Sequence, residues 1–487
     1  MLTRTSSQTL TEQLVNRYTW QIQEGVLLPG ARLPSVRECA RRHGVSPYTV
    51  VAAYDQLQAQ GLVEARKQRG FYVRDVSHDL QHNHAAHNRS SANSADVHAP
   101  VNAVALIRGM MQPWPGFQDR PMPGSGALPV EWLENSFLGM ALRRASSAKL
   151  FNDMSLRYGE PAGDRLLREM LAHRLAQYDV VAHADQIVTT IGATQALDII
   201  TRTLLQSGDA VMVEEPGWSV EFARLVSLGM RVLPVPRGPQ GPDLSVVQHY
   251  CEEFHPRLYV SVSVLHNPTG TCLSPMTAHQ MLQLAQQHDF YIAEDDTYAS
   301  FAPAHMTRVS VLDGLVRTIY VGGFSKILAP NWRVGYLAAA PALVDRLIAT
   351  KLISTLTTPS LMERALAYSL EQGQVRRHAE RLRERLDAAR VRSVRLAEKA
   401  GCQFIFDPAG LFGWVDTGVD TAALAQRMAD MGWLLAPGAL FMVNSGASTY
   451  MRINFATSQD ARFWQDFERA RDAMCSKAAQ NRGKVSP

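Results

Sequence analysis

A lysine directly after an apolar run is the residue best suited to covalent chemistry in this chain. Lys326 ends the motif Gly-Gly-Phe-Ser-Lys at residues 322–326, and Arg333 follows seven residues later. The chain holds seven lysines against 42 arginines, which makes an incidental surface lysine the less favoured interpretation. A lysine amine forms imines with carbonyl compounds, so the motif predicts imine chemistry.

Two other segments supply an acid and two hydrogen-bonding groups. Asp295 directly follows an apolar run, Tyr298 lies three residues further on, and Asn267 belongs to the motif His-Asn-Pro-Thr-Gly. A carboxylate that keeps a pyridine nitrogen protonated turns the ring into an electron sink, and a phenol and an amide can hydrogen-bond a ring oxygen. We expect Glu294 and Asp296, the neighbours of Asp295, to be structural.

A third segment has the features of an anion site. Ala193 and Thr194 stand between a predicted strand and the apolar helical run 196–205. The first N–H groups of a helix and the helix dipole favour an anion, and Ser325 and Arg333 add a hydroxyl and a fixed positive charge. The amine, the acid, the ring-oxygen contacts and the anion site together predict pyridoxal 5′-phosphate, held as an imine by the lysine.

Two more side chains are candidates for contacts with the ring and with a ligand. Trp218, at the end of the motif Glu-Pro-Gly-Trp, would stack on the ring; the alternative is a core tryptophan. Arg452, in the motif Met-Arg-Ile-Asn-Phe, could bind a ligand carboxylate through two parallel hydrogen bonds; the alternative is a buried structural salt bridge.

The elements that must position these residues alternate between strand and helix from Trp132 onward. The strand-like apolar runs are 186–190, 210–214, 257–264, 290–294 and 318–322. Strands that alternate with helical patterns predict an α/β fold with a mostly parallel sheet covered by helices.

The first 75 residues follow another pattern. Three helical stretches precede two strand-like runs, in the order 10–24, 35–43, 46–60, 62–65 and 71–73. A basic turn joins the two runs, and the segment carries ten Arg or Lys against six Asp or Glu, a surplus equal to the +4 of the whole chain. The pattern predicts a winged helix-turn-helix that binds double-stranded DNA.

The predicted DNA contacts come from the recognition helix, the helix before it and the wing. Short polar side chains at the start of a recognition helix face the major groove, while arginines hold phosphates and wing residues reach the backbone or the minor groove. The candidates are Arg32, Ser35, Arg37, Ser46, Tyr48, Thr49, Arg66, Arg69 and Gly70. Each arginine taken alone is also compatible with an ordinary surface charge.

This stretch resembles the GntR-type winged-helix domain over about 65 residues, through the motif Pro-Gly-Ala-Arg-Leu-Pro-Ser-Val-Arg-Glu at 29–38 and Gly-Val-Ser at 44–46. Pro47 departs from the family pattern, because relatives often have arginine just inside the recognition helix. We expect a phosphate or base contact to be lost there. Proline is tolerated in the first helical turn because its missing N–H has no helical partner.

Residues from about 125 to 475 resemble the fold-type I, aspartate-aminotransferase-like enzymes, and the fusion resembles the MocR-type subfamily of GntR regulators. The motifs that carry the resemblance are 158–163, 192–197, 266–270, 294–298, 325–326 and 437–438. The resemblance implies a head-to-tail, domain-swapped homodimer in which Tyr158 reaches the cofactor phosphate of the partner subunit. It also implies a large domain and a smaller α+β domain.

Three positions depart from the enzyme pattern. Gly323 stands where relatives usually have a phosphate-binding Ser or Thr, and Thr194 stands where many have glutamine. We therefore expect weaker phosphate anchoring. Trp218 replaces a more usual tyrosine and removes a hydroxyl near the ring, which suits ligand sensing more than fast proton transfer.

The predicted domains are a DNA-binding domain (8–75), a flexible linker (76–105) and an aminotransferase-like domain (106–478) with a large part at about 132–345 and a small part mainly at 346–478. Five histidines at 78, 82, 84, 87 and 98 lack cysteine partners, so a polar linker is favoured over a metal site. The chain is 46% hydrophobic and 19% charged, has no apolar run that could span a bilayer, and has five scattered cysteines. We expect a cytoplasmic protein with free thiols and no metal.

Three functions are compatible with these features. The favoured hypothesis is a transcription regulator in which an amino compound displaces Lys326 in an external aldimine and alters operator binding by a homodimer. The second is a working aminotransferase, which the sequence does not exclude, so residual enzymatic activity stays open. The third is a regulator of vitamin B6 supply that senses pyridoxal phosphate itself.

Overall fold

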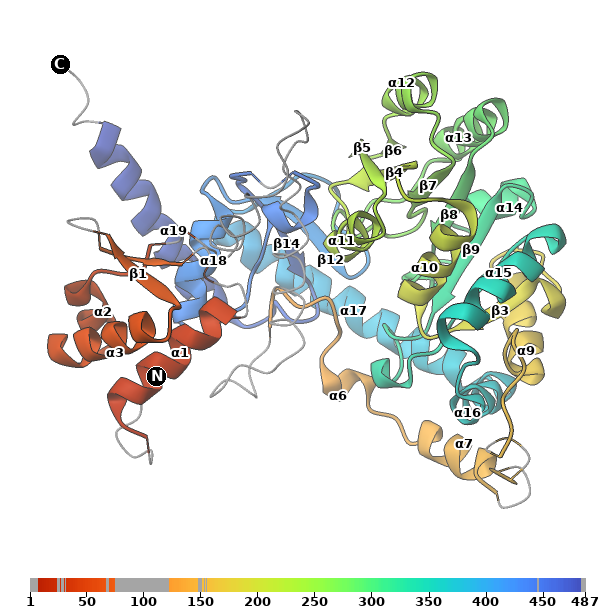
Figure 1. Ribbon diagram of the computed structural model, residues 1–487, viewed down its shortest axis with the longest axis horizontal. Coiled ribbons are helices and arrows are strands. Elements are labelled where there is room, and N and C mark those ends of the chain that lie inside the picture. Colours follow the sequence, from red (N-terminus) through yellow and green to blue (C-terminus); the bar gives the residue numbers. More distant parts are fainter. Residues whose placement is uncertain are drawn as a thin grey trace, which may run out of the picture. The chain divides into compact units, whose positions relative to one another are not determined.

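The structure is a computed structural model, and it describes residues 8–23, 27, 30, 32–66, 70–74, 122–147, 151–152, 154, 156–444 and 446–482. The chain divides into two compact units, Met1–Arg120 and Pro121–Pro487 (Figure 1). The predicted linker 76–105 and its histidines lie outside the described residues. No described helix is long and apolar enough to cross a membrane.

The described part of the first unit is a three-helix domain with a two-stranded wing. Its elements are α1 (Leu10–Gln23), α2 (Val36–His43), α3 (Pro47–Ala59), β1 (Val63–Arg66) and β2 (Gly70–Val73). The strands pair antiparallel, and Leu14, Tyr18, Val50 and Tyr54 form part of a buried core between the helices. The predicted winged helix-turn-helix is confirmed.

The second unit is built on an eight-stranded sheet with the order β3-β10-β9-β8-β7-β4-β5-β6. The strands are β3 (Ile187–Thr190), β4 (Ala210–Glu215), β5 (Arg231–Gly238), β6 (Gly241–Pro242), β7 (Leu258–Ser261), β8 (Tyr291–Asp295), β9 (Thr318–Gly323) and β10 (Gly335–Ala338). The pairs from β9 to β5 are parallel, whereas β10 is antiparallel to both neighbours and β6 is antiparallel to β5.

Helices precede, connect and follow these strands, and several of them cover the two faces of the sheet. They are α6 (Val130–Leu133), α7 (Phe137–Ala145), α9 (Arg165–Ala176), α10 (Ala193–Leu204), α11 (Ser219–Ser227), α12 (Leu244–Phe254), α13 (Pro275–His288), α14 (Val309–Asp313), α15 (Pro341–Thr355) and α16 (Ser360–Glu371). Alternate residues of a strand face opposite sides. Val211 and Val213 accordingly pack in a core with α10, α11 and α15, while Met212 packs in another with α12 and α13.

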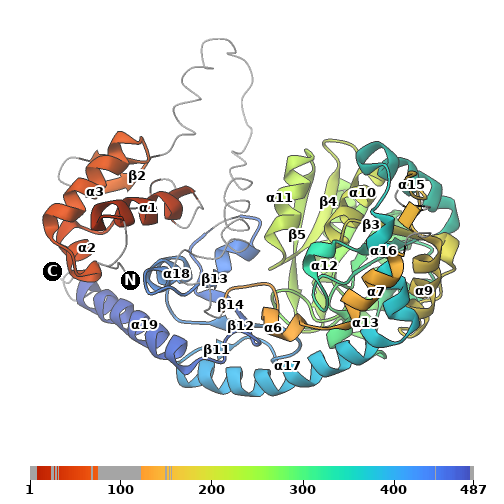
Figure 2. The same ribbon diagram turned by 90° about the horizontal axis from the view of Figure 1, so that it is seen from below.

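A smaller antiparallel sheet follows, with the order β11-β12-β14-β13. Its strands are β11 (Gln403–Phe404), β12 (Phe412–Asp416), β13 (Ala436–Pro437) and β14 (Tyr450–Asn454), and its helices are α17 (Gln374–Lys399), α18 (Thr421–Asp430) and α19 (Ala461–Arg482). The long helix α17 runs from the large sheet to the small sheet (Figure 2). The predicted fold class is confirmed; the domain boundaries at 75, 105 and 345 stay predictions.

The sequence pattern misplaced one strand end and one helix start. The strand predicted at 257–264 ends at Ser261, because the amide of Val262 donates to Glu214 and Leu265 has a φ of 52°, which leaves extended geometry. The helix predicted from residue 196 begins at Ala193, so Ala193 and Thr194 form its first turn. The five cysteines are free thiols, as predicted.

Candidate functional site

The predicted site residues follow the carboxyl ends of the strands. Lys326 follows β9, Asp295 ends β8, Asn267 follows β7, Trp218 follows β4, and Ala193 opens the helix after β3. Parallel strands present their carboxyl ends at one edge of the sheet, which is where open α/β sheets bind ligands. The sheet topology therefore gathers side chains that are far apart in the sequence.

The amine of Lys326 lies at the centre of this edge. Its Nζ donates to the carbonyl of Gly126 at 2.9 Å and lies 5.6 Å from the centre of the Tyr298 ring. Burial, Arg452 and Arg333 lower the pKa of the amine to about 8, while Asp295 acts in the opposite direction. The residue keeps part of its surface exposed at this edge, and its amine is less basic than a free lysine amine.

Asp295 differs from the two carboxylates beside it. Glu294 is fully buried and accepts hydrogen bonds from Ser263 and from the amides at the start of α14. Asp296 is buried against Arg308 at 2.5 Å. Asp295 is partly exposed, accepts from the amide and the hydroxyl of Thr297, and has a pKa raised by burial. Glu294 and Asp296 have the buried partners expected of structural residues, whereas Asp295 is partly exposed.

Arg452 and Asn267 form a buried pair across the two sheets. Arg452 Nη1 donates to Asn267 Oδ1 at 2.9 Å, and Nη2 donates to the carbonyl of Gly124 at 2.8 Å. The guanidinium lies over Phe412 and Phe441, and burial lowers its pKa to about 10. Its Nε is buried without a hydrogen-bond partner among the described residues. A buried donor without a partner is costly unless a ligand satisfies it.

The predicted anion site is assembled from α10 and the turn after β9. Gly192, the residue before α10, has a φ of 77°, and a Cβ there would clash with Arg333 Nη2. Arg333 donates to the carbonyl of Ile191 at 3.1 Å and to Ser325 Oγ at 3.3 Å. Ala193 and Thr194 provide the first-turn amides beside this guanidinium.

Three further predicted site residues differ in how deeply they are buried. Tyr298 is buried, and burial raises its pKa while a hydrogen bond with Asn267 lowers it. Trp218 is partly buried at the start of α11. Tyr158 is 84% exposed, so its side chain is free to contact another molecule.

Sequence reasoning missed the backbone of residues 122–127. The carbonyls of Gly124 and Gly126 contact Arg452 and Lys326, although neither glycine has a functional side chain. The only signal was local: two prolines and two glycines stand within residues 121–126, which favours an irregular backbone.

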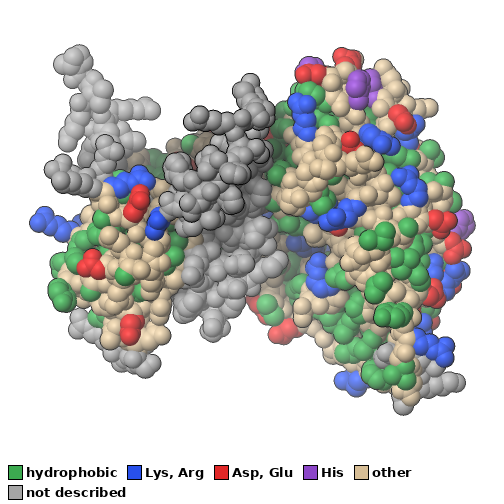
Figure 3. Space-filling model, in the orientation of Figure 1, with side chains coloured by type: hydrophobic (Ala, Val, Ile, Leu, Met, Phe, Trp, Pro, Cys, Tyr) green, Lys and Arg blue, Asp and Glu red, His purple; other side chains and the backbone are tan. Residues whose placement is uncertain are grey.

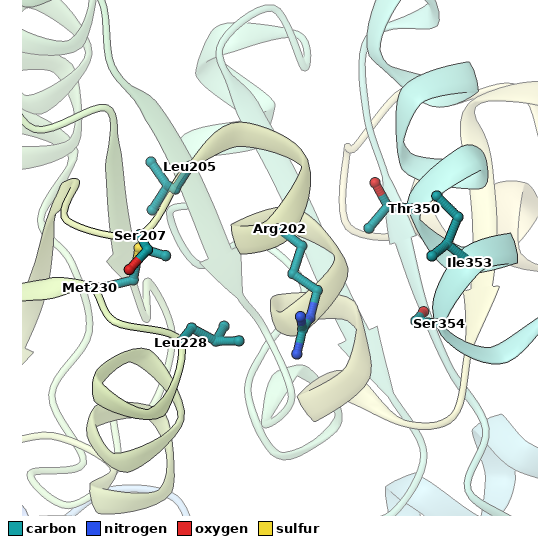
Figure 4. A pocket seen from close by; sticks show the side chains of 8 residues that line it. All are labelled: Arg202, Leu205, Ser207, Leu228, Met230, Thr350, Ile353 and Ser354. Carbon is teal, nitrogen blue, oxygen red and sulfur yellow. The ribbon is translucent and has the colours of Figure 1, made fainter.

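A separate cavity of about 680 Å³ lies between the end of α10 and α15 (Figure 4). It is lined by Arg202, Leu205, Ser207, Leu228, Met230, Thr350, Ile353 and Ser354. None of the predicted site residues lines it, and the guanidinium of Arg202 already pairs with Asp198 at 2.7 Å. The cavity lacks the amine and acid that imine chemistry requires.

In the first unit, three predicted DNA contacts have a local structural role. Ser35 caps α2 by accepting from the amide of Glu38 at 3.3 Å. Ser46 caps α3 by accepting from the amide of Thr49 at 3.1 Å, and the two hydroxyls lie 2.8 Å apart. These short side chains fix the start of the recognition helix, where Pro47 is the first helical residue.

Other predicted contacts are exposed. Tyr48 is 83% exposed, and Arg32 and Arg37 are also at the surface. Arg66 pairs with Glu64 at 2.7 Å and lies over Tyr72. Gly70 opens the second wing strand with a φ of 102°, and Arg69 lies outside the described residues.

The sequence matches two known family models. Residues 131–463 match aminotransferase class I and II, and residues 10–73 match bacterial regulatory proteins of the gntR family. The chain belongs to the GntR-type regulators that carry an aminotransferase class I and II domain. The predicted membership in the MocR-type subfamily is confirmed, and the protein is a helix-turn-helix transcription regulator.

Two regulators are similar over most of their length. The chain is 27% identical over 477 residues to the uncharacterized HTH-type transcriptional regulator YdcR of Escherichia coli K12. The aligned region covers 95% of this chain and 97% of YdcR. It is 30% identical over 393 residues to the probable rhizopine catabolism regulatory protein MocR of Rhizobium meliloti. This aligned region covers 79% of this chain and 76% of MocR.

The fold is also that of solved aminotransferases. The structure of LysN, an α-aminoadipate aminotransferase from Thermus thermophilus, matches with a TM-score of 0.69 at 23% identity and covers 76% of this chain and 95% of LysN. The regulator therefore has the aminotransferase class I fold in addition to a DNA-binding domain.

Proposed function

We propose that this regulator binds pyridoxal 5′-phosphate on Lys326 and senses an amino compound there to alter operator binding. The observation that carries the proposal is the surroundings of the Lys326 amine. Its pKa is lowered to about 8 by burial and by Arg452 and Arg333, with Asp295 also within electrostatic range. Perturbed groups that converge at a ligand-binding edge favour a functional site over an incidental lysine.

The residues present fit the cofactor. Asp295 is partly exposed and has a carboxylate to pair with the pyridine nitrogen, Asn267 and Tyr298 have polar groups for the ring oxygen, and Trp218 has a ring to stack on it. The α10 amides, Ser325 and Arg333 would hold the phosphate. When bound, the cofactor supplies an aldehyde for amines and an electron-withdrawing ring.

Arg452 is the proposed contact for a ligand carboxylate. A carboxylate held by two parallel hydrogen bonds would use the unpartnered Nε and Nη2, which now donates to the carbonyl of Gly124, while Asn267 fixes the guanidinium from the other side. An α-amino acid, with an amine for the cofactor and a carboxylate for Arg452, is the ligand class that uses both ends of the site.

We propose further that two copies form the DNA-binding assembly as a domain-swapped, head-to-tail homodimer. Hydrophobic side chains gather on the face of the second unit that carries α15 (Figure 3). Ile353 of α15 is 90% exposed, and Leu156 and Tyr158 are 76% and 84% exposed. Large exposed apolar side chains favour a protein interface there. An interface at Tyr158 would let this residue reach the phosphate of the cofactor bound by the partner subunit.

An aminotransferase activity is the second candidate. The lowered pKa of Lys326 favours this activity, because an amine with a pKa of about 8 can accept a proton from a ligand near neutral pH. A third reading, in which the cofactor itself is the signal that reports vitamin B6 supply, requires the same residues.

The test is a titration of the full chain with pyridoxal 5′-phosphate, followed by amino acids, amines and keto acids, with visible absorbance as the readout. We expect a cofactor band in the wild type, no band in Lys326→Ala, and a stable shift with one class of α-amino acid. A band in Lys326→Ala equal to that of the wild type overturns the assignment of Lys326. Conversion to the pyridoxamine form, reversed by a keto acid, establishes turnover instead of sensing alone.

A further inference from the structure

Residues Met122–Ala127, called the strap below, lie along the small sheet. Asn454, the last residue of β14, donates through Nδ2 to the carbonyls of Ser125 and Ala127 at 2.9 and 2.8 Å. The Asn454 amide donates to the carbonyl of Pro123 at 3.2 Å, and the Gly124 amide donates to the carbonyl of Leu434 at 2.8 Å. The strap is therefore fixed to the small sheet by bonds that involve no predicted ligand contact.

Close packing also holds the strap at Gly124. A Cβ at this position would clash with the backbone carbon of Leu435, which leads into β13. Real Cβ atoms are not found that close to backbone, so only glycine fits without moving the strap. The position of the strap is thus specified by backbone contact with the small sheet.

The same strap supplies acceptors to both candidate ligand-binding cations. Lys326 Nζ donates to the carbonyl of Gly126 at 2.9 Å, and Arg452 Nη2 donates to the carbonyl of Gly124 at 2.8 Å. Lys326 belongs to the large-sheet side and Arg452 to β14. One short segment therefore contacts both ends of the proposed amino-acid site.

The strap is also the part of the second unit nearest in sequence to the DNA-binding unit. Residues 74–121 connect the wing strand β2 to the strap. A displacement of the strap acts directly on the end of this connection, since no other described element intervenes along the chain.

We infer that the strap is the element that transmits occupancy of the Lys326 and Arg452 site to the DNA-binding unit. The inference rests on the proposed function and adds the route of regulation. While Lys326 holds the cofactor, its nitrogen would no longer offer three ammonium protons to the Gly126 carbonyl, and an amino compound that displaces Lys326 would return them. A ligand carboxylate on Arg452 competes with the Gly124 carbonyl for the same guanidinium.

The two contacts make the strap respond to the cofactor and to the ligand. Loss of the contact at Lys326 frees the strap from the large sheet, while Asn454 keeps it on the small sheet. The strap then follows the small sheet, and its first residue, Met122, is the described residue that directly follows the connection to the DNA-binding unit. The ligand acts on this equilibrium at both cations, because it releases the Lys326 amine and its carboxylate competes with the Gly124 carbonyl for Arg452.

Asn454→Asp tests the strap without changing a cation of the site. The substitution keeps the side-chain volume and the oxygen that accepts from the amide of Ala456, but it replaces the donor to Ser125 and Ala127 by an acceptor. Asn135→Asp is the matched control, because Asn135 also donates to a carbonyl, of Leu133, and accepts from an amide, of Leu138.

The experiment measures binding of the full chain to a duplex selected from a random pool by the wild-type protein. The Kd is measured without additions, with saturating pyridoxal 5′-phosphate, and with the cofactor and an amino-acid mixture. We expect the wild type and Asn135→Asp to show the same ligand-induced fold-change in Kd. In Asn454→Asp we expect this fold-change to fall about fivefold, while the visible cofactor band is kept.

Each other outcome bears on a defined claim. If Asn454→Asp has the cofactor band and keeps the full ligand-induced change in Kd, the inference about the strap is wrong and the proposed function is unaffected. A wild type that gains no cofactor band, or whose Kd is unchanged by every addition, overturns the proposed function and the strap with it. If Asn454→Asp does not fold, Gly124→Ala is used in its place, because the added methyl must displace the strap. A Gly124→Ala variant that keeps the full ligand-induced change in Kd also contradicts the inference about the strap.

Discussion

Lys326 and Lys351 are two lysines of similar acid strength in different regions of the second unit. Burial lowers the pKa of both amines to about 8. Lys351, in α15, is fully buried and donates to the hydroxyls of Thr189 and Thr358 at 3.5 and 3.3 Å. Lys326 is partly exposed at the carboxyl edge of the sheet. A lowered pKa alone therefore does not distinguish a reactive amine from a structural one.

The companions of the two amines make the distinction. Lys351 is surrounded by hydroxyls, with Glu363 and Arg168 as its charged neighbours, and links β3 to the segment after α15. Lys326 has the partly exposed Asp295 and two guanidiniums in range. Chemistry on an amine needs access, an acid and an anion site, and this set is present at Lys326.

The largest expected effect separates the two lysines. Lys326→Ala abolishes the visible cofactor band, because it removes the amine that holds the cofactor. Lys351→Met keeps the band and lowers the free energy of unfolding by about 1–3 kcal/mol, because buried hydroxyls and Glu363 lose a partner. Absorbance and chemical denaturation of both variants check this; loss of the band in Lys351→Met alone would reverse the assignment.

The second effect concerns the carboxylate end of the site. Arg452→Ala lowers the affinity for α-amino acids about 100-fold, because a carboxylate in a buried site loses its charged partner. Amines without a carboxylate bind as to the wild type. Arg462→Ala is the control, because that arginine is exposed and pairs with Asp460 at 2.7 Å. Spectral titrations with matched pairs of amino acid and amine measure the affinity of each variant for both ligand types. An equal loss of affinity for amino acids and amines in Arg452→Ala contradicts the role of Arg452.

The third effect is the pH dependence of cofactor capture by Lys326. Only the neutral amine reacts, so the rate rises about tenfold per pH unit below the pKa and levels off above about 8, not above 10.5. Asp295→Asn moves the midpoint down, because it removes a charge that favours the ammonium form, and Arg452→Gln moves it up. Stopped-flow absorbance gives the profile, and a rate that still rises above pH 9.5 in the wild type contradicts the lowered pKa.

The smallest effect is expected at the exposed DNA-binding surface. Arg37→Ala weakens operator binding by about three- to tenfold and reduces the slope of log Kd against log salt by about one, because one phosphate contact is lost. Arg427→Ala, in α18 of the second unit, is the control. Binding by Arg37→Ala that equals the wild type at each salt concentration removes Arg37 from the contact set.

Most of the fold was predictable because its signals are periodic and local. The strands 210–214 and 318–322 were found from apolar runs, whereas Ser35 and Ser46 were predicted as DNA contacts and the structure adds their role as helix caps. The side chains at the strand ends were predictable for the same reason, since their positions follow from the strand pattern.

The remainder depended on contacts distant in sequence. The role of Gly124 and Gly126 lies in backbone carbonyls, which have no residue signature. The pairing of Arg452 with Asn267 joins residues 185 positions apart, and the end of β7 is set by Glu214 from a neighbouring strand. Such contacts are visible only when the chain is folded.

Ligand-dependent DNA binding tests the central claim most directly. The measurement is the fluorescence anisotropy of a duplex selected from a random pool by the wild-type chain, with and without pyridoxal 5′-phosphate and an amino-acid mixture, for the wild type, Lys326→Ala and Lys351→Met. We predict that the Kd changes with the additions in the wild type and in Lys351→Met, and that Lys326→Ala binds the duplex but does not respond. An equal response in Lys326→Ala would contradict sensing through this lysine.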